Sequence, residues 1–328
     1  MTKKNILFLN GIPDDGKIIV ISIGEHNQLR YKVAGNANIS DHLDEDLITP
    51  FITTFDLDAK QALSPRPGID AVFNQISDAD SHKVTLMKAE LLYNLVSDKL
   101  PFFNSPANIK KTTRDSLYQI LQGIDKLHVP KTVRIQPESP SDIYQAIKDE
   151  QFEFPVIFRQ AGDHGGVSTI KLDDTTEQFY PFSLDGRTYY LTQFIDYKDK
   201  ENDLYIKYRL VVIGGKVFVK SVMPGEQWLV HHATRLSTDE GKAIEQKRLD
   251  SFSKDIAPSI QPTITEIHNR LGLDYFGIDC HIDQDHNILV FEINANMNVF
   301  SSPSDIQIVH TEKIRKALEE LIVNSIKQ

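Results

Sequence analysis

The 328-residue sequence has little of several features that mark specialised classes of protein. Its single cysteine, Cys280, cannot form a disulfide within the chain, which is typical of proteins in a reducing compartment. No apolar run approaches the roughly 20 residues of a membrane-spanning helix. The apolar stretch near the start is short and is interrupted by Asn10 and Gly11, which argues against a secretory signal. We therefore expect a cytoplasmic protein that contacts no membrane.

Positive charge is also in short supply. Lys and Arg total 36 against 46 Asp and Glu, which gives a formal net charge of -10 at pH 7. Nucleic acids are bound by clustered cations, so we expect no nucleic-acid partner. Hydrophobic residues make up 40% and charged residues 25% of the chain, as in ordinary globular proteins. A chain of this length favours two or three packed domains.

The first third of the chain has the pattern of an open α/β domain. Apolar runs predict strands, and apolar residues at helical spacing predict a helix over 85–97. The polar, poorly patterned residues 24–67 predict irregular structure. The strands are expected at 5–10, 17–23, 69–76 and 102–103.

From Phe154 onward the sequence alternates as strands do. One pair of runs, 208–213 and 216–222, is separated by Gly214 and Gly215, the positive-φ residues of a tight hairpin turn. A second pair of strands is expected at 276–282 and 288–293. Helices are predicted over 113–127, 239–254, 258–271 and 309–326.

The segment from Gly11 to Lys17 has the spacing of a phosphate-binding P-loop but not its chemistry. The residue after Lys17 is Ile18 and not the Ser or Thr that binds Mg²⁺. Asp14 and Asp15 would repel phosphate, and a strand-like run follows where a helix is needed. We interpret the segment as a surface turn between two strands.

The chemistry is concentrated in residues 273–298, two predicted strands joined by a polar turn. Asp279 lies in the first strand, and Glu292 and Asn294 project from one face of the second, because they are two residues apart. Two carboxylates and an amide oxygen are hard ligands for Mg²⁺. A solvated polar face is the alternative, which the apolar neighbours of Asp279 and Glu292 disfavour.

Zinc binding and thiol chemistry are weaker interpretations of the same region. Cys280 and His281 are adjacent on a strand and so point to opposite faces, and their spacing from His286 matches no standard zinc site. A small buried thiol is the simpler interpretation of Cys280.

The pattern Gly-Ile-Asp, a turn, then Val-Phe-Glu-Ile-Asn-Ala-Asn resembles the metal-binding signature of the ATP-grasp superfamily. The resemblance extends over about 109–328 and implies a fold that grips ATP between two α+β subdomains, with Asp279, Glu292 and Asn294 as magnesium ligands. It implies three parts: an N-terminal pre-ATP-grasp α/β domain, 1–108; a small subdomain that forms the nucleotide lid, 109–191; and a large subdomain with the metal site, 192–328.

The resemblance also assigns cations to the phosphates. Arg209, on a strand-turn-strand, corresponds to the arginine near the γ-phosphate, where it would stabilise charge during phosphoryl transfer; a surface ion pair is its structural alternative. Arg159 stands where the family usually has Lys, and Ser116 stands at the other usual Lys, with Arg114 close by. Arg is always charged and binds phosphate through two donors, so Arg159 and Arg114 are expected to substitute.

The resemblance further implies an adenine site and a phosphate-covering loop. Gln193, Phe194 and Ile195 correspond to the hinge whose backbone reads the adenine edge. Gly165 and Gly166 belong to a glycine-rich loop whose N–H groups can approach phosphate oxygens.

Peptide-forming relatives often carry an Arg/Asn pattern after the arginine strand, and this chain has Trp228, His231 and His232 there instead. Trp228 and His231 are expected to shape the acceptor site, where His231 could take the proton of an amine. A core tryptophan with hydrogen-bonded histidines fits the sequence equally well.

The resemblance is to glutathione-synthetase-like or ribosomal-modification-like ligases. It implies an enzyme that uses ATP and Mg²⁺ to join a small-molecule or peptide carboxylate to an amine through an acylphosphate. A small-molecule kinase and a catalytically silent ATP-binding module are the alternatives, the second because the usual lysines are replaced. Such ligases often dimerise, so a homodimer is among the expected states.

Overall fold

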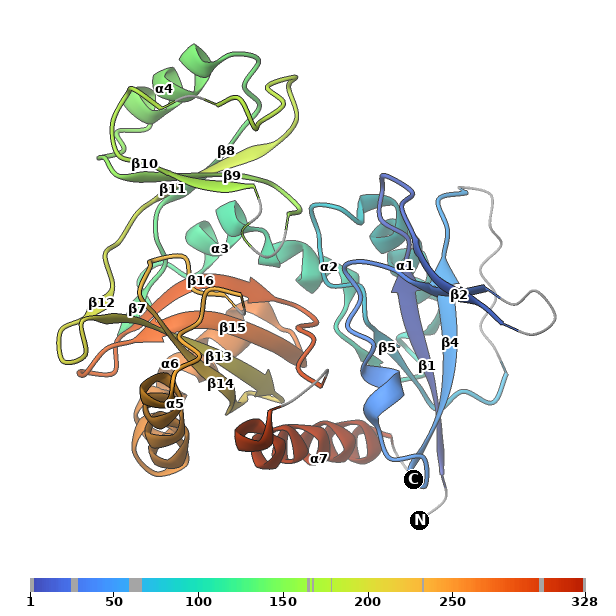
Figure 1. Cartoon of the computed structure of the whole chain (residues 1–328). Coiled ribbons are helices and arrows are strands. Elements are labelled where there is room, and N and C mark those ends of the chain that lie inside the picture. The colour runs from blue at the N-terminus through green and yellow to red at the C-terminus, as the bar shows by residue number, and fades with distance from the viewer. Residues whose placement is uncertain are drawn as a thin grey trace.

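Three larger β-sheets with their own helices, and a separate two-stranded sheet, build the described part of the protein (Figure 1). The computed structural model describes residues 3–24, 29–58, 67–163, 166, 168–177, 179–231, 233–300 and 304–326. Within these residues, no helix is both long and apolar enough to cross a membrane.

The N-terminal sheet is parallel, in the order β4-β1-β5-β6. The helix α1, Lys83–Val96, packs on one face, and the other face joins a core shared with the C-terminal helix α7, Ile308–Ser325. The predicted open α/β arrangement is therefore confirmed. Its strands are β1, Lys4–Gly11; β4, Ile48–Phe55; β5, Ala71–Asn74; and β6, Phe102–Phe103.

The expectation of irregular structure over 24–67 is wrong for much of that segment. It contains the strand β4, which pairs in parallel with β1 over eight residues, as well as β3, Leu29–Lys32, and the short helix η2, Ile39–His42. The alternation of β4 is weak because it is an edge strand with one face largely solvated. Pro50 is tolerated there because an edge strand needs no partner for every N–H group.

The apolar run 17–23 does form a strand, β2, Ile19–Ile23, but not a buried one. It pairs only with β3 in a two-stranded sheet outside the main one, and all five of its residues are exposed. The preceding segment is the turn that we expected. There Asp14 accepts hydrogen bonds from the backbone N–H groups of Lys83 and Val84, at 3.0 and 3.1 Å, and so caps the start of α1.

The second sheet is antiparallel, in the order β10-β9-β11-β8. Its core packs under α4, Pro140–Asp149, which begins with a capping box at Ser139. Phe158 and Tyr189 stack in this core with ring centroids 4.6 Å apart. The strands are β8, Thr132–Ile135; β9, Val156–Gln160; β10, Thr169–Leu172; and β11, Tyr189–Gln193.

The third sheet runs β12-β13-β15-β16-β7. The strand β14 pairs with β13 on the side away from β15. The predicted hairpin is present, with positive φ at Gly214 and Gly215. The helices α5, Asp239–Ser251, η4, Phe252–Ile256, and α6, Ala257–Leu271, follow one another without a break. The strands are β7, Leu127–His128; β12, Lys198–Asp199; β13, Leu204–Ile213; β14, Lys216–Gly225; β15, Tyr275–Ile282; and β16, Ile288–Asn294.

The connection between the first two sheets differs from the predicted helix over 113–127. The helix α3, Arg114–Ile120, is shorter because Gly123 adopts a φ of 73°, outside the helical region. It follows α2, Pro106–Ile109, and η3, Lys110–Thr112. The strand β7 then joins the third sheet before the chain enters the second.

Candidate active site

Asp279 and Glu292 are direct partners in the antiparallel pair of β15 and β16. Side chains of paired residues lie on the same face of a sheet, and both carboxylates line one cavity. Asn294, two residues beyond Glu292, pairs with Gly277 and lies on the same face of the strand. The sequence prediction thus brought together three residues that the fold places side by side.

Asp279 is buried and surrounded by positive charge. Arg209 donates to both of its carboxylate oxygens at 2.9 Å, and Nζ of Lys207 lies 2.7 Å from Oδ2. Burial alone would raise the pKa of the Asp279 carboxyl, but the charges of Lys207 and Arg209 outweigh burial and lower this pKa. The sequence interpretation missed Lys207. Lys207 could have been found from the sequence, because it stands two residues before Arg209 on a predicted strand and alternation places both cations on one face.

Glu292 pairs with Arg114, the first residue of α3. The same guanidinium also donates to the carbonyl of Phe291. Ser116, which stands at the position of a usual lysine, instead accepts a hydrogen bond from the Thr113 hydroxyl at 2.8 Å. Arg114 therefore supplies the positive charge that Ser116 cannot.

Arg159 projects from β9 of the second sheet into the same cavity. Its Nη2 donates to the Asp163 carbonyl at 2.9 Å. Burial and the nearby charge of Arg114 lower the pKa of the Arg159 guanidinium to about 9. It remains charged at neutral pH, held close to another cation.

The cavity is lined by residues of the second and third sheets, which lie one above the other in Figure 1, and has a volume of about 200 Å³. Leu117, Ile157, Leu289 and Val290 contribute apolar walls. Its charged lining consists of four Lys or Arg cations and two carboxylates, a surplus of two positive charges in a chain whose net charge is -10. The lining cations are Arg114, Arg159, Lys207 and Arg209.

The predicted hinge closes one end of this cavity. The N–H groups of Gln193 and Phe194 are engaged by the carbonyls of Lys131 and Pro155, at 2.8 and 3.3 Å. Phe194 and Ile195 both line the cavity. The hinge thus offers an aromatic ring to a purine, whereas the N–H groups of Gln193 and Phe194 are already bonded within the protein, so that other backbone groups of the hinge would have to contact the purine edge.

Trp228, which we expected to shape the acceptor site, lines the cavity beside the hinge residue Phe194. Its ring meets that of Phe194 edge to face, with centroids 5.7 Å apart and planes at 87°. Nζ of Lys171 lies 5.2 Å from the centroid of the Phe194 ring. The Tyr197 hydroxyl donates to the Trp228 carbonyl. Trp228 therefore shapes the same wall as the hinge.

His231 lines the cavity and accepts a hydrogen bond at Nδ1 from the N–H of Ala233, at 3.1 Å. This contact leaves the ring proton on Nε2 in the neutral form. His231 is therefore arranged to donate a hydrogen bond from Nε2, and the predicted role of proton acceptor requires Nδ1 to give up its contact.

The predicted glycine loop is described in part. Gly165 lies outside the described residues. Gly166 lines the cavity with a φ of 76°, and a Cβ placed there would lie 3.1 Å from Cδ2 of Leu229. Gly166 thus packs closely on the segment that carries His231, at a point where a larger residue would have to displace Leu229.

A smaller cavity borders the first on the side of the N-terminal domain. Glu292 and Asn294 reach it from β16, and Asp78 and Asp80 reach it from the loop after β5. Glu292 lines both cavities. The predicted metal ligands therefore lie where the two cavities meet.

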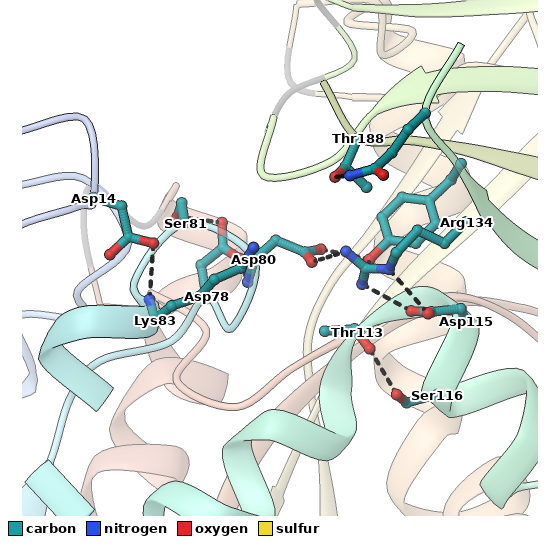
Figure 2. A network of polar contacts seen from close by, with 12 residues as sticks. Asp14, Asp78, Asp80, Ser81, Lys83, Thr113, Asp115, Ser116, Arg134 and Thr188 are labelled. Carbon is teal, nitrogen blue, oxygen red and sulfur yellow. Dashed lines mark hydrogen bonds and ion pairs between the residues drawn. The ribbon is translucent and has the colours of Figure 1, made fainter. Parts of the chain in front are cut away.

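An ion-pair network joins the N-terminal domain, α3 and the second sheet (Figure 2), and Asp80 and Tyr190 of this network line the smaller cavity. Arg134 of the second sheet lies 2.8 Å from Asp80 of the N-terminal domain and donates twice to Asp115 of α3, at 3.0 Å. The Tyr190 hydroxyl donates to Asp80 at 2.6 Å. Nothing in the sequence pattern indicated these contacts, because they join segments far apart in the chain.

The other candidates in the sequence have structural roles. In the described part of the chain, no three His, Cys, Asp or Glu side chains form a group suited to a metal ion. Cys280 is fully buried, which raises the pKa of its thiol, and Nδ1 of His281 bonds to the carbonyl of Ile206 at 2.8 Å.

The donor set at Asp279, Glu292 and Asn294 suits magnesium, which takes oxygen ligands and keeps positions open for phosphate. Asn294 Oδ1 accepts the N–H of Asn296 at 3.0 Å, and a carbonyl oxygen retains a second lone pair. Two carboxylates and one amide oxygen leave coordination positions that a nucleotide can complete.

Comparison with protein-family models matches residues 116–318 to the RimK-like ATP-grasp domain. A solved RimK domain protein from Sphaerobacter thermophilus DSM 20745 is similar, with a TM-score of 0.51 at 16% identity over 98% of this chain and 99% of that chain. The D-alanine-D-alanine ligase from Coxiella burnetii is also similar, with a TM-score of 0.55 at 14% identity over 98% of this chain and 96% of that chain.

The ATP-grasp ligase PsnB complexed with minimal precursor gives a TM-score of 0.54 at 15% identity, over the full length of both chains. At such identities the likeness shows the fold alone. Comparison with curated protein sequences gives no match.

Proposed function

Because the chain belongs to the RimK-like ATP-grasp family, we propose that it is an enzyme that uses Mg-ATP to activate a carboxylate and join it to an amine. The predicted fold class and the resemblance to the ATP-grasp superfamily are confirmed. The nature of the two co-substrates, small molecule or peptide, stays a prediction, as do the domain limits at 108 and 191.

One observation carries the proposal: four cations from three different elements converge on one cavity beside two carboxylates. A surplus of positive charge in a cavity this small is stabilised by a bound polyanion. Arg159 and Arg114 lie close enough for one charge to lower the pKa of the other. A triphosphate placed between them would remove that repulsion.

The proposed reaction has two steps. An oxygen of the donor carboxylate attacks the γ-phosphorus of ATP, the bond to the bridging oxygen breaks, and ADP leaves with an acylphosphate remaining. The amine nitrogen then attacks the acyl carbon, phosphate leaves, and the nitrogen gives up a proton as the amide forms. Arg209 and Arg159 would stabilise the charge on the transferred group through donors fixed in place before the reaction.

Asp279, Glu292 and Asn294 would hold Mg²⁺, which when bound neutralises phosphate charge and acts as a Lewis acid. The hinge from Gln193 to Ile195 would hold the adenine, with Phe194 against the ring. Gly166 would let the loop backbone approach the phosphates.

His231 would act at the acceptor side of the cavity. Its Nε2–H can hold an acceptor oxygen of the second substrate, and a proton from the amine can be taken only after Nδ1 releases the Ala233 N–H. The role of proton acceptor that the sequence suggested therefore stays a prediction that depends on this rearrangement.

The replacement of the two usual lysines does not favour a catalytically silent ATP-binding module. Arg114 and Arg159 both line the cavity, so the charge that the two usual lysines provide is present. The smaller cavity adjoining Glu292 leaves room for a co-substrate beside the phosphates, which a ligase and a kinase both require.

The proposal is tested by calorimetry of ATP binding with and without Mg²⁺. We expect Mg²⁺ to strengthen binding in the wild type, and we expect this dependence to be lost in Asp279→Asn and Glu292→Gln. Glu320→Gln on the exposed surface of α7 is the control and should behave as the wild type.

A screen of amino acids and peptides for ADP release then separates the alternatives. ADP formed only with both a carboxylate and an amine supports the ligase, and a phosphorylated single acceptor supports a kinase. If the wild type does not bind Mg-ATP, the proposal is wrong.

A further inference from the structure

Both carboxylates that we assign to magnesium are covered by cations of the chain itself. Asp279 is contacted by Lys207 and Arg209. Glu292 is contacted by Arg114. These contacts bring three positive charges to two negative ones, in a place where water screens little, because the side chains of Lys207 and Asp279 are 13% and 3% exposed. A dication that arrived alone would add to a charge that is already positive.

The two oxygens of Asp279 differ in their contacts. Oδ1 accepts a hydrogen bond from Nε of Arg209 at 2.9 Å. Oδ2 accepts one from Nη2 of the same guanidinium at 2.9 Å and also lies 2.7 Å from Nζ of Lys207. A carboxylate oxygen has two lone pairs, so both positions of Oδ2 are taken. Withdrawal of Lys207 would therefore open a coordination position on a carboxylate that Arg209 continues to orient.

Of the three cations, Lys207 is held by the fewest contacts. Arg209 bonds to both oxygens of Asp279, its direct partner on the paired strands β13 and β15. Arg114 bonds to a backbone carbonyl as well as to Glu292. Within the described residues, Asp279 is the one hydrogen-bond or ion-pair partner of the Lys207 ammonium. An ammonium on a flexible four-carbon stem can exchange one oxygen for another, whereas a planar guanidinium that bonds to two oxygens is held in one geometry.

A second partner for Lys207 is available in the same cavity. Lys207 lines it together with Arg159 and Arg209, the two cations that we propose for the transferred phosphate. A triphosphate bound there would offer oxygens with more negative charge than a single carboxylate that two cations share. The exchange from Asp279 to a phosphate oxygen would thus keep the buried ammonium paired before and after binding.

We propose that Lys207 is an exchangeable cation, which covers Asp279 while the site is empty and passes to a phosphate oxygen when the nucleotide binds. The inference rests on the proposed function, since the phosphates are those of ATP. It implies an order of binding, because a divalent cation alone meets the ammonium at its ligand and a nucleotide draws the ammonium away. Lys207 would thus keep the carboxylate closed to metal ions that arrive without a nucleotide.

The test compares the wild type with Lys207→Met in two separate titrations. In the first, Mn²⁺ alone is added and the free ion is followed by electron paramagnetic resonance. Lys207→Met should bind Mn²⁺ about tenfold more tightly than the wild type, because a positive charge beside the ligand is gone. In the second, ATP is titrated by calorimetry in the presence of EDTA. It should bind to Lys207→Met roughly tenfold more weakly, because a charge-assisted contact to phosphate is lost.

The opposite signs of these two effects distinguish exchange from a structural role. If Lys207 only holds Asp279 in place, its loss should leave Mn²⁺ affinity unchanged or lower, and ATP should bind as in the wild type; either result would overturn the proposal. The gain in Mn²⁺ affinity should also vanish when Asp279→Asn is added. A gain that persists would place the ion elsewhere and would overturn the proposal as well.

Two further variants complete the design. Lys207→Gln keeps a hydrogen-bond donor for the buried carboxylate, so it disturbs the fold less and should shift both affinities in the same directions as Lys207→Met. Lys198→Met is the matched control, because Lys198 also lies 2.7 Å from a carboxylate, that of Asp203, but on β12 outside the cavity lining. Lys198→Met should match the wild type in both titrations.

The outcome for this inference is distinguishable from the outcome for the proposed function. A wild type that does not bind Mg-ATP refutes the function and, with it, the inference. A wild type that binds Mg-ATP, combined with a Lys207→Met variant that binds Mn²⁺ no more tightly than the wild type, refutes the exchange of Lys207 and leaves the function standing.

Discussion

Arg209 and Asp279 face each other on the paired strands β13 and β15, and their side chains meet in a two-point ion pair with both contacts at 2.9 Å. The pair fixes the carboxylate in one orientation, with the charge of Asp279 raising the pKa of the Arg209 guanidinium. The cation assigned to the γ-phosphate and the carboxylate assigned to magnesium are therefore held in place by one another before any ligand binds.

The first prediction concerns Arg209→Lys. Lysine keeps the charge but loses the planar fork that contacts two oxygens at once. We expect ADP formation with both co-substrates to fall by about 100-fold, with ATP affinity changed much less. Arg248→Lys is the matched control, because Arg248 is also paired with a buried carboxylate, Asp199, but on α5 outside the cavity. Equal loss of rate in both variants would contradict the assignment of Arg209.

The second prediction concerns Arg134, the centre of the network in Figure 2. Replacing it by Met leaves Asp80 and Asp115 without their cation. We expect the free energy of unfolding at pH 7 to fall by about 2 kcal/mol, below the value for a fully buried pair because Arg134 is partly exposed. Tyr190→Phe removes only a hydroxyl and should cost about 1 kcal/mol. Urea unfolding measures both.

The pH dependence of this loss has a definite sign. Burial would raise the pKa of Asp115, but its bonds to Arg134 lower it below the ordinary 3.8. The stabilisation is present in full above 3.8 and is lost as the pH falls through the lowered pKa. The difference between wild type and Arg134→Met should therefore be constant at neutral pH and shrink in strong acid. A difference that grows in acid would contradict the ion pair as its source.

The metal ligands could be predicted because their geometry is local. Glu292 and Asn294 share a face through strand alternation alone, and a short turn brings Asp279 opposite Glu292. The same rule would have found Lys207 from Arg209. Contacts such as Arg134 with Asp80 join different sheets, and no periodicity carries that information.

Two features of the N-terminal domain show where apolar pattern is ambiguous. In α1, Leu91 and Leu92 contribute equally to a helical pattern, yet one is exposed and the other is in the core. In β4 the edge position weakens the alternation, and the strand was missed. The sequence predicts that an element is apolar, but which side is covered depends on tertiary packing.

The third prediction concerns Lys220, which is buried on β14 and donates to the Thr311 hydroxyl at 2.7 Å. Burial and the charge of Arg209 lower its pKa from 10.5 to about 8. Between pH 8 and 10.5 the unfolded chain binds the proton that the folded chain has lost, so stability should rise with pH over this window.

Lys220→Met should abolish that rise and gain about 2 kcal/mol at pH 7, where the wild type must keep a buried charge. Lys99→Met, at an exposed site, should keep the pH dependence of the wild type. Urea unfolding at several values between pH 7 and 10 provides the comparison. A variant that is less stable than the wild type at pH 7 would show that the bond to Thr311 outweighs the cost of burial.

The fourth prediction separates backbone strain from contact at the glycine loop. Gly166 and Gly123 have nearly the same φ, 76° and 73°, so alanine should cost each about 1 kcal/mol of stability. Only at Gly166 would the new methyl group press on a neighbour, Leu229, at 3.1 Å; at Gly123 nothing lies within 4 Å. Because Leu229 lines the cavity that we propose for ATP, we expect Gly166→Ala to weaken ATP binding by about tenfold and Gly123→Ala to leave it unchanged.

Adding Leu229→Ala to Gly166→Ala should recover much of the lost affinity, because the truncated side chain leaves room for the methyl group. Calorimetry of the wild type, Gly166→Ala, Leu229→Ala and the double variant measures this coupling directly, since two residues in contact give effects that do not add. Additive losses of ATP affinity would show that Gly166 affects ATP binding through its own backbone alone and that its contact with Leu229 has no effect.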